Sequence, residues 1–297
     1  MRICTFSVLK EDTRSRLGLI RNSRVFDLTE QTSLTDIISG KDIDSLEVRG
    51  RGYELKQVVL RAPIQRPGKI LATIVNTRGM LGGDISLDRP RIDMKAPSSI
   101  IGPGEEIRAP STGIRPEVEL AAVVGRKISK ASVKEAKESI FGYTVLNDVT
   151  APSDSRDDAY EAFRRDKKSG AITKTILRGP LFRSKNHDTF CPLGPWIVTA
   201  DEEIEWSNLR MTTKFDGVLV QDGSTAEYIF SPEKIASYIS GFLTLEPGDI
   251  VSCGSVGWSP GTVGALDPTE FVLPSKPGIL ELEVDGIGIL ANPVART

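Results

Sequence analysis

Histidine and cysteine are scarce in this sequence, and their scarcity narrows the chemistry open to the chain. One histidine and three cysteines occur among 297 residues. A single histidine sets aside the zinc sites that are built on several imidazoles. Cys4, Cys191 and Cys253 are odd in number, far apart and without a metal-binding spacing. Free thiols in a reducing cytosol are therefore the simplest interpretation.

An excess of charge of one sign and long hydrophobic runs are missing too. The 38 lysines and arginines nearly balance the 40 aspartates and glutamates, so no basic stripe predicts nucleic-acid binding. No apolar run approaches the length that spans a bilayer, and the first residues lack the apolar region of a signal peptide. We expect a cytoplasmic protein that acts on a small molecule and has neither a nucleic-acid nor a membrane partner.

Short apolar runs separated by turn residues predict a strand-rich chain with few helices. Residues 1–64 suggest a small N-terminal β-rich domain with a helix-like stretch from Leu46 to Leu60. Residues 65–297 suggest a larger catalytic domain that begins with a strand over 69–75. Residues 76–116 are rich in glycine and proline and predict a long loop near a site.

Two helices carry clear start signals. Ser132 with Glu135 three residues on forms a capping box for a helix over 132–138, and Ser231 before Pro232 begins a second one that runs to about residue 243. This mixture predicts an α+β class, mostly β, with a mixed sheet or roll rather than a doubly wound fold.

The most informative segment is Glu117-Val118-Glu119, at the start of a predicted strand over 117–125. Because strand side chains alternate between faces, Glu117 and Glu119 share one face. Adjacent carboxylates repel unless a proton or cation lies between them. Asp148, which follows a second predicted strand, could complete an all-oxygen site suited to Mg²⁺ or Mn²⁺. The alternative is that both glutamates face solvent at a strand start.

Several motifs, in this order, resemble the fumarylacetoacetate hydrolase family, and the resemblance runs from about Pro67 to Val294. They are Asn147-Asp-Val-Thr150, Lys185-Asn-His-Asp-Thr-Phe-Cys-Pro-Leu-Gly-Pro-Trp-Ile-Val-Thr199, Leu245-Glu-Pro-Gly-Asp-Ile-Val251 and Gly286-Ile-Gly-Ile-Leu-Ala-Asn292. The resemblance implies a β-roll catalytic domain and a homodimer. It also implies a divalent metal, Mg²⁺ or Mn²⁺ with Ca²⁺ possible, on Glu117, Glu119 and Asp148.

The substrate class implied by the resemblance is a 2-oxo or 1,3-dioxo acid. Three carboxylate ligands leave about three positions open on an octahedral ion, and a 2-oxo acid can fill two of them. The ion then acts as a Lewis acid that stabilises an enolate. Hydrolysis of a C–C bond, decarboxylation, tautomerisation and hydration share that step, so the site predicts the substrate class better than the reaction.

Lys185 matches the family's lysine near the metal, where an ammonium would stabilise developing negative charge. If residues 184–187 are extended, His187 lies on the same face and could act as an acid or base near neutral pH. Alternatively, Lys185 is a solvated surface lysine and His187 a structural residue.

The sequence departs from the family where water would be activated. Family hydrolases usually carry a histidine and a glutamate after the first strand, but Met80 and Gly83 stand near those positions. The family also carries an arginine shortly after the metal aspartate, but here Pro152 follows Ala151 and the arginine is lost. A helix-like charged segment follows over residues 154–168. Arg78 or Arg156 could replace the lost arginine as an anion clamp, since arginine binds carboxylates bidentately; a solvated helix face is the alternative.

Gln221 is a further candidate for contacting the substrate, because it matches a recurrent family position; alternatively, it only orders a hairpin. Gly254 and Ser255 are candidates too, because they lie where the family binds a substrate carboxylate. Cys253 adjoins them but has no neighbouring histidine to activate it.

Three functions stay open at this point, and we expect the first of them. The first is a metal-dependent hydrolase of a C–C bond in an acylpyruvate-like or related acid, which the whole-chain resemblance favours. The second is a decarboxylase, isomerase or dehydratase of a 2-oxo acid, which the missing dyad favours. The third is a binding protein on an inactive scaffold, against which the intact Glu117, Glu119, Asp148 and Lys185 argue.

Overall fold

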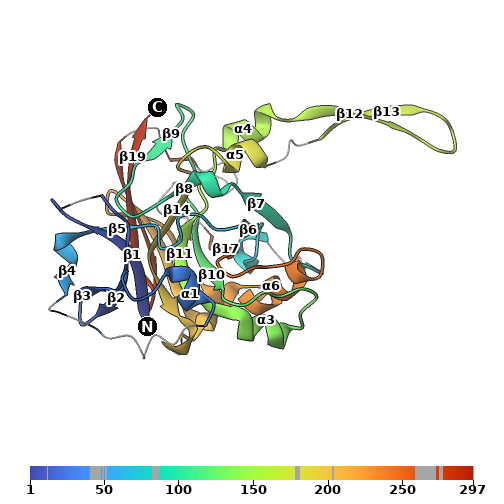
Figure 1. Cartoon of the computed structure of the whole chain (residues 1–297). Coiled ribbons are helices and arrows are strands. Elements are labelled where there is room, and N and C mark those ends of the chain that lie inside the picture. The colour runs from blue at the N-terminus through green and yellow to red at the C-terminus, as the bar shows by residue number, and fades with distance from the viewer. Residues whose placement is uncertain are drawn as a thin grey trace.

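Strands dominate the fold. The computed structural model describes residues 1–11, 13–40, 48, 50, 52–81, 87–177, 181–202, 204–257, 272–273 and 277–296. Within these, the larger sheet has the strand order β4-β3-β2-β1-β14-β11-β10-β17-β6-β7, with β5 paired to β1 and β8 to β14 (Figure 1). Its strands are β1 (Arg2–Val8), β2 (Arg16–Arg21), β3 (Arg24–Asp27), β4 (Tyr53–Glu54), β5 (Val58–Arg61), β6 (Ile70–Thr73), β7 (Ile92–Lys95), β8 (Ile100–Ile101), β10 (Val118–Val124), β11 (Ile140–Asn147), β14 (Cys191–Thr199) and β17 (Ile250–Ser255). The predicted α+β class, mostly β, is confirmed.

A second sheet has the strand order β16-β15-β18-β19-β9. Its strands are β9 (Ile107–Ala109), β15 (Arg210–Phe215), β16 (Val218–Ser224), β18 (Gly278–Val284) and β19 (Gly288–Arg296). Its inner face, which includes Leu282 and Leu290, joins one hydrophobic core with Val118 and Leu120 of β10. The odd-numbered neighbours Ala121 and Val123 of β10 pack in a different core. Strand alternation therefore places Glu117 and Glu119 on the face of the large sheet opposite the second sheet.

The helices are short, and the two whose starts the sequence predicts begin at the predicted caps. They are α1 (Leu34–Ile38), α2 (Arg78–Leu81), α3 (Val133–Ser139), α4 (Pro152–Asp157), α5 (Phe182–Lys185) and α6 (Pro232–Ser240). Ser132 and Glu135 form the predicted capping box of α3, and Ser231 caps α6. Helix α6 ends at Ser240, three residues before the predicted end. None of the helices within the described ranges is long and apolar enough to cross a membrane.

Two predicted helical stretches are wrong. The described part of the stretch ending at Leu60 forms β4, a short 3-10 turn and β5. The charged segment 154–168 is helical only as far as Asp157, and β12 (Tyr160–Arg165) and β13 (Ile172–Leu177) then form a separate hairpin that projects from the body (Figure 1). Alternating apolar side chains and cross-strand pairing outweigh helix-compatible charges there.

The N-terminal strands are part of the large sheet. Strand β1 pairs with β14 through Arg2 opposite Val198 and Ile3 opposite Ile197, so the N-terminal strands extend the large sheet. The proposed boundary between residues 64 and 65 stays a prediction. The segment 76–116 is broken by α2, β7, β8 and β9, and β7 brings a residue to the candidate site.

Candidate metal centre

Three buried carboxylates meet where β10 begins and β11 ends. Val118 of β10 lies opposite Asn147 of β11, and the Asp148 N–H donates to the Glu117 carbonyl at 3.0 Å. This register brings the side chains of Glu117, Glu119 and Asp148 together, with one oxygen of each within 4.8 Å of the others. All three residues are buried. The geometry agrees with the predicted triad and contradicts the alternative of solvent-facing glutamates.

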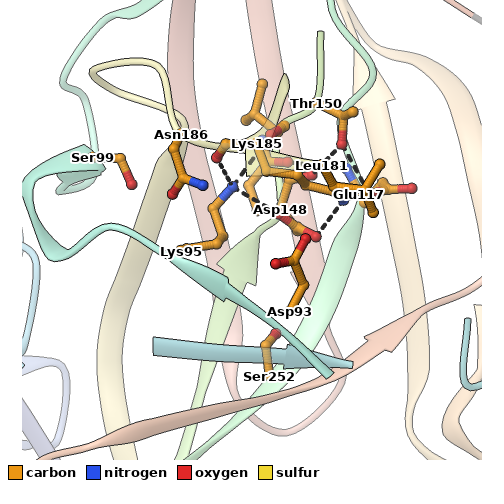
Figure 2. A network of polar contacts seen from close by, with 12 residues as sticks. Asp93, Lys95, Ser99, Glu117, Asp148, Thr150, Leu181, Lys185, Asn186 and Ser252 are labelled. Carbon is orange, nitrogen blue, oxygen red and sulfur yellow. Dashed lines mark hydrogen bonds and ion pairs between the residues drawn. The ribbon is translucent and has the colours of Figure 1, made fainter. Parts of the chain in front are cut away.

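Two lysines face this triad, as Figure 2 shows for the side of Asp148. The Lys185 ammonium lies 2.5 Å from Glu117 Oε2 and 2.5 Å from Asp148 Oδ2. The Lys95 ammonium lies 2.7 Å from Asp148 Oδ1. Lys185 therefore lies inside the cluster, and the alternative of a solvated surface lysine is excluded.

Lys95 is the residue that the sequence analysis missed. It is 1 % exposed, and its ammonium donates to the Lys185 carbonyl at 2.6 Å and to the Val149 carbonyl at 3.3 Å. It therefore connects one carboxylate of the triad to the backbone that carries Lys185. The only available signal was a lysine inside a segment without hydrophobic periodicity, which on its own predicts a surface residue.

The charges of the cluster are unevenly distributed. Burial works against ionised Asp148, but Lys185 and Lys95 outweigh it and lower the pKa of Asp148 below its ordinary value. Burial likewise opposes the charge of Lys185, but Asp148 and Glu117 raise the pKa of Lys185. These two carboxylates therefore favour the protonated, cationic form of Lys185.

Glu119 is the carboxylate that no lysine contacts directly. Burial raises its pKa to about 8, the Asp148 and Glu117 charges adding to this effect. The Ser252 hydroxyl donates to Glu119 Oε2 at 2.5 Å and the Gly254 N–H at 3.1 Å. These neutral donors do not supply the positive charge that its ionised form requires.

The chemistry of the donor set fits a hard divalent cation. All three donors are carboxylate oxygens, which Mg²⁺, Mn²⁺ and Ca²⁺ prefer over the softer metals. The raised pKa of Glu119 marks the place where a positive charge is lacking. Glu117, Glu119 and Asp148 are thus the residues that would hold the ion.

His187 lies in a different setting from the one predicted. Lys185 is the last residue of α5, so residues 184–187 are not extended and the expected shared face is wrong. His187 Nε2 lies 2.5 Å from Asp154 Oδ2, on α4, and its ring contacts Phe190 with centroids 4.8 Å apart. The histidine is thus paired with a carboxylate outside the triad, and it is partly exposed.

The side chain of Gln221 makes four hydrogen bonds within the protein. Its Oε1 accepts from the Val118 N–H at 3.0 Å and the Thr213 hydroxyl at 2.7 Å, and its Nε2 donates to Ser255 Oγ at 3.0 Å and the Val256 carbonyl at 2.8 Å. Gln221 therefore joins β16 to β10, β15 and β17 beside the triad. Its predicted contact with substrate, and that of Ser255, stay predictions.

Gly254 shapes the backbone beside Glu119. Its φ is +96°, and a Cβ there would lie 2.7 Å from Cβ of Asn76. Only glycine combines that conformation with so close an approach. Its predicted contact with a substrate carboxylate stays a prediction.

The segment with the missing dyad begins at Asn76. The Asn76 amide donates to the carbonyls of Cys253 and Phe230 at 2.7 and 2.8 Å. Arg78 is exposed at the start of α2 and Met80 is half-buried on the same helix, while Gly83 lies outside the described residues. Arg78 as an anion clamp stays a prediction, as does Arg156 on α4.

Comparisons with known proteins agree with this geometry. The family model described as fumarylacetoacetate (FAA) hydrolase C-terminal matches residues 75–295. The human mitochondrial oxaloacetate tautomerase FAHD2A is 30 % identical over 287 residues, which cover 93 % of this chain and 84 % of that protein. A 2,4-didehydro-3-deoxy-L-rhamnonate hydrolase from Sphingomonas is 30 % identical, over 79 % of this chain and 75 % of its own.

Solved structures share the whole fold. A 5-carboxymethyl-2-hydroxymuconate delta-isomerase from Mycobacterium smegmatis superposes with a TM-score of 0.73 at 28 % identity, covering 100 % of this chain and 99 % of its own. A maleylpyruvate hydrolase from Sphingobium, solved with manganese(II) and pyruvate, has a TM-score of 0.72 at 22 % identity, covering 100 % and 99 %, and at that identity shows the fold alone.

Proposed function

Because the chain belongs to the fumarylacetoacetate hydrolase family, we propose that it is a divalent-metal-dependent enzyme that interconverts the keto and enol forms or shifts the double bond of a 2-oxo acid. The family's members include hydrolases, isomerases and tautomerases. The observation that carries the proposal is the buried triad of Glu117, Glu119 and Asp148 with Lys185 held against it.

The residues of this chain have distinct roles in that reaction. The triad would hold the ion, which as a Lewis acid would polarise the keto oxygen of the substrate. Lys185 keeps its proton, so it would supply a fixed positive charge for the oxygen that becomes negative in the enol form. In such a proton shift the carbon next to the keto group would give its proton to a solvent water, and the enol oxygen would take one back from solvent. No residue that activates water for attack on carbon is required, and Met80 stands where family hydrolases carry their histidine.

Hydrolysis of a C–C bond is the second candidate, and the pairing of Asp154 with His187 favours it. A carboxylate that orients an imidazole is the arrangement by which enzymes activate water or a hydroxyl. In an acylpyruvate, water would add to the acyl carbon, the C–C bond would break, and a carboxylic acid and pyruvate would leave. Decarboxylation and dehydration need the same metal-assisted step and remain less favoured outcomes of the test below. The homodimer and the cytoplasmic location stay predictions.

The decisive experiment follows candidate substrates by NMR in ²H₂O. The purified chain is incubated with oxaloacetate and with an acylpyruvate, each with Mg²⁺, Mn²⁺ or EDTA, and the metal without protein serves as the blank. Metal-dependent deuterium exchange at the carbon next to the keto group, beyond the blank, supports the tautomerase or isomerase. A carboxylic acid and pyruvate formed from the acylpyruvate only with metal favour the hydrolase. Pyruvate and carbon dioxide formed from oxaloacetate beyond the blank would indicate decarboxylation. Turnover that persists in EDTA would refute the metal role in either.

Two variants separate these outcomes. Glu119→Gln removes a triad carboxylate with little change in shape, and we expect it to abolish both reactions. His187→Ala is expected to abolish hydrolysis and to leave the proton exchange intact. Fragments that His187→Ala forms as fast as the wild-type chain would exclude His187 as the base.

A further inference from the structure

The hairpin of β12 and β13 carries an unusually apolar exposed face. Cross-strand partners point to the same side, so the pairs Phe163–Lys174 and Arg165–Ile172 share one face with Ile176. On that face Phe163 is 64 % exposed, Ile172 60 % and Ile176 71 %. We call residues 160–177 the arm.

The arm has no cover within its own chain. Figure 1 shows it extending away from both sheets, and among the described strands β12 and β13 pair only with each other. A single two-stranded hairpin in water is at best marginally stable, and contiguous exposed apolar side chains mark an interaction surface. The apolar face of the arm therefore has the character of an interaction surface.

The root of the arm is firmly fixed to the body. Arg183 of α5 lies 2.7 Å from Asp158 Oδ1, immediately after α4, and its Nη2 also donates to the Asp154 carbonyl at 3.4 Å. His187 adds its contact with Asp154. The helices α4 and α5, which flank the arm in the sequence, are thus joined to each other.

A second copy could cover the arm either with its own arm or with its body, and the charges of the two parts favour the body. The arm carries five basic and two acidic residues, a formal net charge of +3. Subtracting this from the chain's formal net charge of −2 leaves −5 on the rest of the chain. Two arms would repel each other, whereas an arm and the body of another copy attract.

The outer face of β18 and β19 has the matching character. Ile279 is 46 % and Ile289 48 % exposed, and the register places Ile289 opposite Glu283 on the side away from the core. Glu281 lies between Ile279 and Glu283 on that same side.

On the arm, Lys174 is paired with Glu161 of the same face, which leaves Arg165 as its uncompensated charge. On the body, Lys214 of β15 lies opposite Glu281, which leaves Glu283. The remaining charges are opposite in sign, and the apolar side chains of the two faces can pack together.

We propose that the arm of one copy packs on the outer face of β18 and β19 of a second copy, in a homodimer with reciprocal contacts. Because the attraction is partly electrostatic, added salt weakens this dimer. The proposal concerns assembly and does not depend on the reaction that the enzyme catalyses.

Sedimentation of the full-length chain tests the assembly. Phe163→Ser combined with Ile176→Ser removes two of the three exposed apolar side chains of that face, and we expect the dimer dissociation constant to rise at least about tenfold. Tyr160→Ser is the matched control, because Tyr160 is 52 % exposed on the opposite face of the arm. Circular dichroism of both variants checks that they fold. A wild-type monomer, or equal dissociation constants for the two variants, would overturn the proposal.

Cross-linking locates the contact. The photoreactive residue p-benzoylphenylalanine replaces Phe163, in a mixture of isotopically light and heavy chains. Cross-links between light and heavy chains that map to residues 278–296 support the proposal. Links within one chain, or from arm to arm, would overturn it, and links to another part of the second copy would overturn the assignment of β18 and β19. Retention of the wild-type chain on anionic lipid vesicles instead of dimer formation would point to a membrane surface and contradict the second copy.

Discussion

Replacing Lys95 by methionine tests the charge arrangement of the candidate site. The ammonium lies 2.7 Å from Asp148 Oδ1 and is 1 % exposed. At an effective dielectric constant of about 20 this attraction is about 6 kcal/mol, an upper bound that ignores desolvation. Removing one partner of a buried pair destabilises proteins by about 3–5 kcal/mol. Because Lys185 still compensates Asp148, we expect the lower end, about 3 kcal/mol.

The assay is thermal unfolding in EDTA, so that no metal masks the change. For a chain of this size, about 3 kcal/mol corresponds to a fall in Tm of about 6 °C. Lys127→Met is the control, because Lys127 lies 2.8 Å from Glu246 in a solvent-exposed ion pair and its loss is expected to change stability by less than about 1 kcal/mol.

The pH dependence separates lost charge from lost packing. The pKa of Asp148 is lowered below 3.8 in the folded chain, so its ionised form stabilises the fold above pH 3.8, and this stability is lost as the pH falls through the lowered pKa. The difference between Lys95→Met and wild type should therefore shrink below pH 3.8. A Tm equal to that of Lys127→Met, or a difference that persists in acid, would refute the electrostatic reasoning.

Three further predictions concern the residues around the site. Because burial raises the pKa of Glu119 to about 8, Mg²⁺ binding at neutral pH should release about one proton, and the affinity should increase as the pH rises towards 8. Calorimetry in two buffers of different ionisation enthalpy measures the number of protons released. Zero release would mean that Glu119 is already ionised. Gln221→Leu leaves the buried Val118 N–H without its acceptor and should destabilise the chain by about 1–3 kcal/mol in urea unfolding; an unchanged midpoint would contradict its joining role. Asp154→Asn should lower any hydrolysis by weakening the orientation of His187 and leave proton exchange unchanged; equal loss of both would indicate structural damage instead.

Part of the triad could be predicted from the sequence because its geometry is local. Alternation along one strand places Glu117 and Glu119 on one face, and an antiparallel neighbour brings the residue after its own strand, Asp148, to the same end. The capping box of α3 is equally local, with Ser132 and Glu135 separated by three residues. Local patterns thus predicted the shared face of Glu117 and Glu119 and the start of α3. Asp148 joins them through the pairing of β10 with β11, and the family resemblance, not a local pattern, indicated it.

The residues that the sequence analysis missed or misplaced depend on contacts between distant segments. Lys95 reaches Asp148 across 53 positions of the chain, from a strand of four residues in a segment without periodicity. His187 reaches Asp154 because α4 and α5 pack together at the root of the arm. The arm itself has a composition that suits a solvated helix, and the facing apolar residues Phe163 and Ile176 become informative only once the hairpin register is known.

The charges of the cluster indicate an order for metal and substrate. With Glu119 protonated, the carboxylates Glu117 and Asp148 balance the ammoniums of Lys185 and Lys95, and the cluster is neutral. An anionic oxo acid gains little from a neutral, buried site, because burial removes its hydration without supplying opposite charge. A divalent cation that displaces the proton would leave the same five side chains and the ion with a net charge of +1. We therefore expect metal to bind first and the anionic substrate second, so that oxo-acid binding in EDTA is undetectable by the calorimetry that detects it with Mg²⁺; equal binding in EDTA would contradict this balance of charges.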